Sequence, residues 1–280
     1  MAPQHSAPLV ACNGAHIPSF GLGTWELREE TARAMVREAL TLGVRHIDTA
    51  RIYGNERAVG EGIRSAGVIR EEIFLTTKLP PDLLRADSVA RAAEEALSEL
   101  DVGYIDLLLI HWPSRDIPLK ETLKAFAALK RTGMVRHIGV SNFSVALVEE
   151  AVAVSPEPIV TNQVEYHPYL QQGKVLEACR RHGISLTAYS PLARGRVAND
   201  LVIGAVARDH QKTAAQVALR WLVQQEGVIV IPRSSKKARL IENFSIYDFS
   251  LSPTEMSRIA ALAHPAGRQV DPDGWAPVWD

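Results

Sequence analysis

The chain has 280 residues, of which 46% are hydrophobic and 22% are charged, and its formal net charge is −1. This composition can form a hydrophobic core, and the absence of a basic run excludes a protein that binds nucleic acid through charge. No signal peptide is recognisable, no apolar run approaches the ~20 residues of a membrane span, and the two cysteines form no metal or disulfide motif. We therefore expect a cytoplasmic protein.

The first predicted element is a β-hairpin over Leu9–Pro18. Asn13-Gly14 stands between apolar residues there, and this dipeptide is typical of a two-residue hairpin turn. In a barrel, such a hairpin would close the lower end.

Eight short apolar runs follow, and they alternate with helical segments. The runs predict strands at Ser19–Leu22, Arg45–Asp48, Ile73–Lys78, Ile105–His111, Val135–Ser141, Ile159–Gln163, Ile184–Tyr189 and Val228–Ile231. Their nearly continuous apolar character indicates a parallel sheet with both faces covered. This alternation predicts an α/β fold, either a closed (β/α)8 TIM barrel or an open, doubly wound sheet.

The segments between the strands carry the helical period, with apolar residues at i, i+3, i+4, i+7 and i+8. One such face contains Ala32, Met35, Val36, Ala39 and Leu40, and another contains Val89, Ala92, Ala93, Ala96, Leu97 and Leu100. After the eighth strand, Ser252-Pro253 opens a further helix over Glu255–Leu262, and the tail from Pro265 is irregular.

The turn after the first strand decides between the two α/β folds. Its sequence GLGTWE, Gly21–Glu26, lacks the third glycine of a dinucleotide-binding turn, which disfavours a Rossmann domain. We therefore predict that residues 1–280 form a single (β/α)8 barrel domain with an N-terminal hairpin and an extra C-terminal helix.

Polar or aromatic side chains stand at the ends of seven consecutive strands. They are Asp48, Lys78, His111, Ser141, Asn142, Gln163, Tyr189, Arg233 and Ser234. In barrels of this kind the catalytic groups lie where the strands end, on one face of the molecule. The set therefore predicts an active site at that face.

Asp48 and Lys78 come from adjacent strands, so we expect them to form a buried ion pair. Tyr53 follows Asp48 in a loop, and the Lys78 ammonium is expected to lower its pKa toward the range of effective proton transfer. His111, on the next strand, would orient a carbonyl oxygen. Together these groups would protonate a carbonyl oxygen while hydride reaches the carbon.

Five motifs in the chain resemble those of the aldo-keto reductases, in particular the prokaryotic 2,5-diketo-gluconate reductase-like members. They are GVRHIDTARIYGNE (Gly43–Glu56), LTTKLP (Leu75–Pro80), LLLIHWP (Leu107–Pro113), IGVSNF (Ile138–Phe143) and IPRSSKKARLIENF (Ile231–Phe244). The resemblance covers essentially the whole chain, with every motif in order. It implies a catalytic tetrad of Asp48, Tyr53, Lys78 and His111, with Tyr53 as the general acid in reduction.

The resemblance also implies NADPH bound without a Rossmann unit. Its nicotinamide would contact Ser141, Asn142 and Gln163 and stack on Tyr189. The implied contacts to the rest of the cofactor are Gly23, Thr24, Ser190, Leu192, Arg233, Ser234, Arg239, Glu242 and Asn243, of which Arg233, Ser234 and Arg239 would grip the 2′-phosphate and adenine.

The substrate pocket is expected between Trp25 and Trp112. The short segment Ser114–Pro118 suggests an open pocket for small aldehydes, 2-oxoaldehydes and diketones. Trp275 and Trp279, in the tail, would either fold over this pocket or cover the side of the barrel. We expect a monomer that has a small-molecule carbonyl partner and binds neither nucleic acid nor membrane.

Two alternatives compete with a reductase. A metal-dependent barrel hydrolase would use His46, Asp48 and His111 as ligands, but the chain lacks the H-x-H pair at its first strand, and Tyr53 and Gln163 would have no role. A non-catalytic cofactor-binding module of the same fold is the other alternative, and the complete tetrad argues against it.

Overall fold

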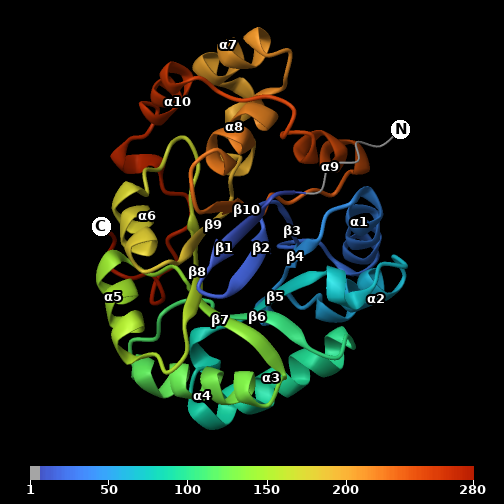
Figure 1. Cartoon of the computed structure of the whole chain (residues 1–280), viewed down its shortest axis with the longest axis vertical. Helices are drawn as coiled ribbons and strands as arrows, with labels where there is room; N and C mark the ends of the chain where they lie inside the picture. Colours follow the sequence, from blue (N-terminus) through green and yellow to red (C-terminus); the bar gives the residue numbers. More distant parts are fainter. Residues whose placement is uncertain (1–6) are drawn as a thin grey trace.

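The computed structural model describes residues 7–280. Its main feature is a sheet of eight parallel strands in the order β10-β9-β8-β7-β6-β5-β4-β3 (Figure 1). Parallel bridges from Phe20 to Val230 and from Gly23 to Arg233 join the two edges, so the sheet closes into a barrel. The predicted (β/α)8 barrel is therefore confirmed.

The predicted strands all exist. Their bounds are β3 Gly21–Gly23, β4 His46–Asp48, β5 Phe74–Leu79, β6 Ile105–Ile110, β7 Val135–Ser141, β8 Ile159–Glu165, β9 Ser185–Tyr189 and β10 Val228–Val230. The largest difference is at β3, which begins two residues later than predicted. Its flanking residue Ser19 accepts the backbone N–H of Val230 instead, because the chain there completes the closure of the barrel.

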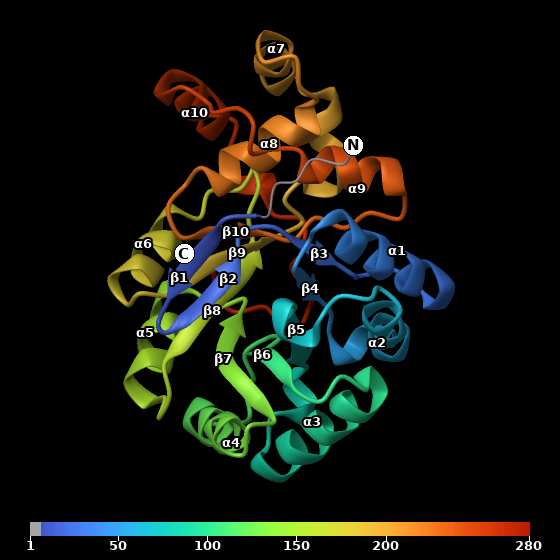
Figure 2. The ribbon, with the colours of Figure 1, turned by 45° about the vertical axis from the view of Figure 1, so that its right-hand side comes forward.

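Helices surround the outside of the sheet (Figure 2). Their bounds are α1 Glu29–Leu42, α2 Glu56–Arg64, α3 Ala86–Leu100, α4 Leu119–Arg131, α5 Val145–Val154, α6 Gly173–Arg181, α7 Leu201–Asp209, α8 Ala214–Val223, α9 Lys237–Phe244 and α10 Pro253–Ala260. The five residues buried by α1 are those predicted from the helical period. None of the helices in residues 7–280 is long and apolar enough to cross a membrane.

The extra C-terminal helix α10 begins where Ser252-Pro253 predicts. The Ser252 side chain accepts the backbone N–H of Glu255, whose own side chain bonds back to the N–H of Ser252. This reciprocal capping satisfies two N–H groups that the first helical turn leaves unpaired. The helix ends at Ala260, two residues before the predicted end.

The hairpin of β1 (Leu9–Cys12) and β2 (Ala15–Pro18) closes one end of the barrel, as predicted. Asn13 and Gly14 both have positive φ, 42° and 85°, as the predicted turn requires. The buried side chain of Ile17 belongs to a hydrophobic cluster with Leu107 and Ile229 from the barrel strands. Figure 1 shows the hairpin in front of the barrel. The carboxyl ends of the parallel strands therefore meet at the opposite end.

Candidate active site

The centre of the site is a buried ion pair between β4 and β5. The Lys78 ammonium lies 2.5 Å from Asp48 Oδ1, and the side chains are 0% and 2% exposed. The partner of Asp48 in the strand register is Thr76, so Lys78 lies two residues further along the same face of β5. Both charges thus point into the barrel, and the predicted pair is confirmed.

Each N–H of the Lys78 ammonium has a partner. Besides Asp48, Nζ donates to the backbone oxygen of Thr49 at 2.8 Å and to the Tyr53 hydroxyl oxygen at 3.3 Å. The second oxygen of Asp48 accepts a hydrogen bond from Gln163 Nε2 at 2.8 Å. Asp48 therefore orients two groups at once, and the lysine has no free donor.

Tyr53 ends the short 3₁₀ helix Arg51–Tyr53, directly after the strand that carries Asp48. Its ring centroid lies 4.9 Å from that of Trp25 and 5.7 Å from that of His111, both in edge-to-face orientation. Because the hydroxyl oxygen accepts a hydrogen bond from Lys78, the phenolic proton is left available. Nothing in residues 7–280 accepts that proton.

The expected lowering of the Tyr53 pKa is wrong for this structure. Burial raises the pKa of Tyr53 well above its ordinary value of 10.0, and the Asp48 carboxylate raises it further. These two effects outweigh the stabilisation that the Lys78 ammonium, itself paired with Asp48, gives to the phenolate. Tyr53 therefore remains protonated at neutral pH.

His111 follows β6 and is 8% exposed. Its pKa lies well below the ordinary 6.5, first because of burial and second because of the Lys78 charge. The imidazole is therefore neutral at pH 7. Of its ring nitrogens, Nδ1 is buried and has no partner among the described residues, which leaves Nε2 as the polar edge that solvent and ligands reach.

The side chains at the ends of β7, β8 and β9 form one connected polar group. Tyr189 donates its hydroxyl to Asn142 Oδ1 at 2.8 Å, and Asn142 Nδ2 donates to Ser141 Oγ at 3.1 Å. Ser141 in turn donates to the backbone oxygen of Gln163 at 2.8 Å. Asn142 has φ of 63°, a left-handed conformation that its short polar side chain tolerates. The structure thus brings together the four residues expected around a nicotinamide.

A model of the aldo/keto reductase family matches residues 19–264. The chain belongs to the aldo/keto reductase family. Among its relatives, methylglyoxal reductase DkgB of Escherichia coli O157:H7 is 43% identical over 94% of this chain and 99% of that protein. Glyoxal reductase of Bacillus subtilis (strain 168) is 43% identical over 89% of this chain and 90% of that protein.

Solved structures of this family match throughout the barrel. The crystal structure of a protein described as a 2,5-diketo-D-gluconic acid reductase B gives a TM-score of 0.96 at 48% identity, covering 98% of each chain. An aldo-keto reductase of Bombyx mori in complex with NADP gives a TM-score of 0.87 at 35% identity, covering 92% of this chain and 94% of that one. As an aldo/keto reductase, the protein is an oxidoreductase enzyme.

In this aldo/keto reductase, the edge where the barrel closes carries most of the residues expected to hold the rest of the cofactor. Gly23 lies so close to Ile231 that a Cβ atom would stand 2.7 Å from its backbone oxygen. The backbone N–H and the hydroxyl of Thr24 both donate to the backbone oxygen of Asp48. In the loop after β9, Ser190 has φ of 48°, and Leu192 follows it.

The basic residues after β10 are exposed. Arg233 stands 3.9 Å from Glu26, a weak contact, and Arg239 on α9 makes no ion pair within residues 7–280. Ser234 caps the chain locally by donating to the oxygen of Lys236. The Glu242 carboxylate accepts the hydroxyl of Thr213, the residue that caps α8, and Asn243 is buried. The two arginines are therefore free to meet an anion.

In the C-terminal tail, Trp279 lies over the pocket side of the barrel, next to Trp112. Its ring packs edge-on against Trp112, with the centroids 6.2 Å apart, and the guanidinium of Arg268 lies 3.6 Å above it. Trp112 is 4% exposed and follows His111 directly. The tail thus folds toward the pocket, while Trp275 is half-buried in the same segment.

Sequence patterns gave no role to Glu165, which anchors this tail. It ends β8, and its two carboxylate oxygens accept the backbone N–H groups of Gln269 and Val270 at 2.9 Å each. His167 Nε2 lies 2.9 Å from the same carboxylate. The one signal in the sequence is an acidic residue two positions beyond the predicted strand end at Gln163.

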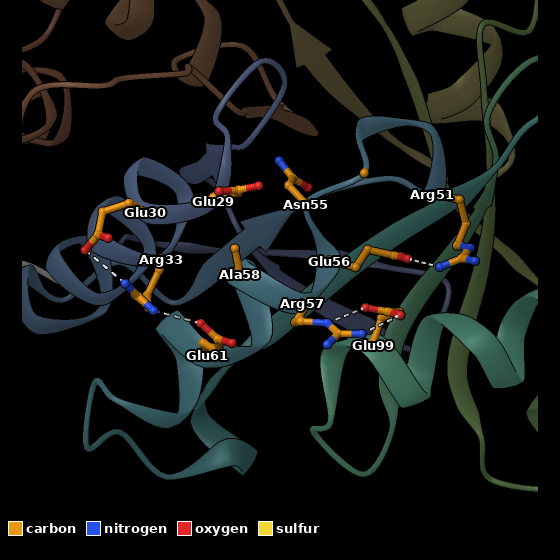
Figure 3. A pocket seen from close by; sticks show the side chains of 11 residues that line it. Glu29, Glu30, Arg33, Arg51, Asn55, Glu56, Arg57, Ala58, Glu61 and Glu99 are labelled. Atoms are coloured by element: carbon orange, nitrogen blue, oxygen red, sulfur yellow. Dashed lines mark hydrogen bonds and ion pairs between the residues drawn. The ribbon is translucent and has the colours of Figure 1, made fainter.

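A cavity of about 620 Å³ lies against the loop that carries Tyr53 (Figure 3). It is lined by charged side chains of α1, α2 and α3 and of the Tyr53 loop, namely Glu29, Glu30, Arg33, Arg51, Glu56, Arg57, Glu61 and Glu99. No member of the tetrad lines it. The cavity is therefore not the carbonyl site, although its wall supports the loop that carries Tyr53.

The ligands of the alternative metal site are not brought together. His46 Nε2 lies 3.1 Å from Thr76 Oγ1, its ring packs against Phe74, and Asp48 is paired with Lys78. Within residues 7–280, no group of three or more His, Cys, Asp or Glu side chains is arranged to hold a metal ion. The geometry and the family assignment both favour the reductase.

Proposed function

We propose that this protein catalyses the NADPH-dependent reduction of small aldehydes, 2-oxoaldehydes and diketones to alcohols. The support for this substrate class is the similarity to proteins named methylglyoxal reductase and glyoxal reductase, since both names denote small dicarbonyl compounds. The short connection from His111 to Pro118, before α4, adds little bulk above the pocket.

The observation that carries the proposal is the orientation of Tyr53. Lys78 donates to the hydroxyl oxygen, which leaves the phenolic proton for another acceptor, and the rings of Trp25 and His111 flank that of Tyr53. Since the pKa of Tyr53 is raised, the group holds its proton until a stronger base is formed beside it. The oxygen of a carbonyl group that receives hydride becomes such a base.

The reaction is balanced by two transfers. The hydride for the carbonyl carbon would come from a nicotinamide held by Ser141, Asn142, Gln163 and Tyr189. Tyr53 gives its proton to the carbonyl oxygen, which completes the alcohol. The phenolate left on Tyr53 accepts the Lys78 hydrogen bond, and that charge-assisted bond stabilises the transition state more than the starting phenol.

His111 positions the substrate. Because the imidazole is neutral and Nδ1 meets no acceptor among residues 7–280, the favourable tautomer carries its proton on Nε2, where a ligand can accept it. That N–H would hold the carbonyl oxygen near the Tyr53 hydroxyl. Trp25 and Trp112 then form the walls of the pocket.

The polar residues at the ends of the strands fit the groups of nicotinamide adenine dinucleotide phosphate. Gln163 uses its amide N–H for Asp48, which leaves its side-chain oxygen as an acceptor for a carboxamide. Ser141 and Asn142 supply further polar groups, and the half-buried ring of Tyr189 offers a stacking surface. Gly23, Thr24, Ser190 and Leu192 would surround the sugar and pyrophosphate, and Arg233, Ser234 and Arg239 the 2′-phosphate, with Glu242 and Asn243 near the adenine.

We also propose that the protein acts as a cytoplasmic monomer, with a carbonyl compound as its partner. Light scattering of the purified protein and fractionation of the cells that make it test these two points.

The decisive experiment replaces Tyr53 with Phe. The variant should lose roughly 10² to 10⁴ in the rate of methylglyoxal reduction, the range typical of general acid catalysis, while its affinity for NADPH stays the same. Tyr166→Phe is the matched control, because it removes a buried hydroxyl that only meets Gln225. Retention of more than a tenth of wild-type turnover by Tyr53→Phe, with chemistry rate-limiting, would refute the assignment.

A further inference from the structure

A buried carboxylate, Glu56, lies beneath the loop that carries Tyr53. Glu56 is the first residue of α2 and its side chain is 3% exposed. It reaches both the loop and a barrel strand, and no role in the reaction has been assigned to it so far. Figure 3 shows its side chain directed at Arg51, in the wall of the charged cavity.

The two oxygens of Glu56 have different partners. Oε2 accepts from Arg51 Nη1 at 2.5 Å, and Oε1 accepts from Thr77 Oγ1 at 2.6 Å. Arg51 stands two residues before Tyr53 in the same 3₁₀ helix, and Thr77 stands one residue before Lys78 on β5. One carboxylate therefore links the 3₁₀ helix that carries Tyr53 to the strand that carries Lys78.

We propose that Glu56 is a positioning residue for reduction, which together with Arg51 and Thr77 fixes the Tyr53 hydroxyl against the Lys78 ammonium. The proposal rests on the role of Tyr53 as proton donor. The proposed role is to hold the distance between the Lys78 ammonium and the Tyr53 hydroxyl. The contact from Nζ to the Tyr53 oxygen is 3.3 Å, longer than the other hydrogen bonds of this ammonium. A small outward shift of the loop would break it.

The loop has other attachments. The backbone N–H of Thr49 donates to the oxygen of Thr76 on β5, and the backbone oxygen of Thr49 accepts from Lys78. These bonds hold the start of the loop, four residues before Tyr53. Asn55 donates to the backbone oxygens of Thr24 and Leu27 and accepts from Thr49. These bonds hold the loop to the segment after β3. After Tyr53, the bond from Thr77 to Glu56 ties the loop to the strand of Lys78.

Burial of Glu56 suits this role. An unpaired carboxylate in the interior is costly, but here Arg51 neutralises it and Thr77 satisfies its second oxygen. The negative charge also favours the ammonium form of Lys78: burial lowers the pKa of Lys78, and Asp48 and then Glu56 oppose that lowering.

The test separates position from fold by removing single hydrogen bonds. Glu56→Gln and Thr77→Val should each lower kcat for methylglyoxal roughly ten- to a hundredfold, the cost of a misplacement by about 1 Å. The KM for NADPH should not change, and the slowing in heavy water should increase because proton transfer becomes more limiting. Thr77→Ser keeps the hydroxyl and should restore most of the lost rate.

The matched control is Glu99→Gln. It breaks the Arg57–Glu99 pair, which lies in the same cavity wall. Among the described residues the Glu99 side chain makes no hydrogen bond to the Tyr53 loop, so this variant should leave kcat unchanged. If Glu56→Gln fails to fold, judged by circular dichroism, Thr77→Val decides the matter. Wild-type kcat in Thr77→Val, or an equal loss in Glu99→Gln, would overturn the proposal.

Tyr53→Phe is measured in parallel. If it is inactive while Thr77→Val and Glu56→Gln keep full kcat, only the positioning role is wrong. If Tyr53→Phe remains active, the proton donor has been misassigned, and the positioning role falls with it.

Discussion

Lys78 is the most constrained residue of the site, since every N–H of its ammonium has a partner and its side chain is fully buried. An arrangement of this kind is rigid, and it keeps the charge in one place as Tyr53 changes its protonation. Removing the lysine should therefore affect both the reaction and the fold.

The variant Lys78→Met should be almost inactive and should unfold at a lower temperature. It leaves Asp48 buried without its cation, and losing one member of a buried pair typically costs ~3–5 kcal/mol of stability. The double variant Asp48→Asn with Lys78→Met should recover part of the stability without any activity. Equal melting temperatures for Lys78→Met and the wild type would contradict the pairing.

The sequence predicted the Asp48–Lys78 pair, because adjacent parallel strands bring their carboxyl ends together. It did not predict the direction of the Tyr53 pKa shift. That direction depends on how completely Asp48 cancels the lysine charge and on how deeply the phenol is buried. Both follow from side-chain packing between several elements, which no local pattern contains.

At the scale of elements, the strands and helices follow from the periodicity of apolar residues. The residues that α1 buries are those of the predicted face, and α10 starts at its predicted cap. The ends of β3 and β8 were less predictable. Ser19 pairs with Val230 where the barrel closes. Strand β8 runs on to Glu165 because Val164 and Glu165 continue the pairing with Ala188 and Tyr189 of β9.

Helix α9 and the loop before it should set the choice of cofactor. Arg239 is exposed and unpaired within the part of the chain that the structure describes, so the variant Arg239→Ala loses no internal contact. A hydrogen bond to a charged group contributes about 1.5–3 kcal/mol, so the variant should bind NADPH roughly ten- to a hundredfold more weakly. Binding of NADH should hardly change.

Fluorescence titration measures both affinities, and the loss should shrink as salt is added. Arg258→Ala, on the exposed surface of α10, is the control for a general effect of charge. If the wild type binds NADH and NADPH equally well, no phosphate site exists around Arg233 and Arg239.

At the scale of the whole molecule, acid should destabilise the barrel through His46. Burial, the main cause, lowers the pKa of this side chain from 6.5 to about 4. The unfolded chain then binds more protons than the folded one between those pH values, so stability is complete above pH 6.5 and falls as the pH drops toward 4. The loss from this residue alone is about 3 kcal/mol.

Urea unfolding at several pH values checks this expectation. The variant His46→Gln should show a smaller fall in the free energy of unfolding between pH 6.5 and 4, although it is less stable at pH 7 because the packing against Phe74 is lost. His111 contributes a similar acid dependence in both proteins. Identical slopes for the variant and the wild type would exclude His46 as the source.

That residues 1–280 form one folding unit stays a prediction. The closed sheet supports it, because the first and last strands pair with each other and a partial unfolding would open the barrel. A single transition in the same urea experiments, seen alike by fluorescence and circular dichroism, is the expected behaviour.

The bridge between Phe20 and Val230, which closes the barrel, can form only late in the synthesis of the chain. These residues are about 210 positions apart, so at typical synthesis rates the first strand waits roughly 10 to 40 seconds before its final partner leaves the ribosome. During that time one edge of the growing sheet has unpaired backbone groups, and such an edge can pair with other chains. The nascent chain is thus most exposed to aggregation in its first half, and that half is where we expect a chaperone to bind.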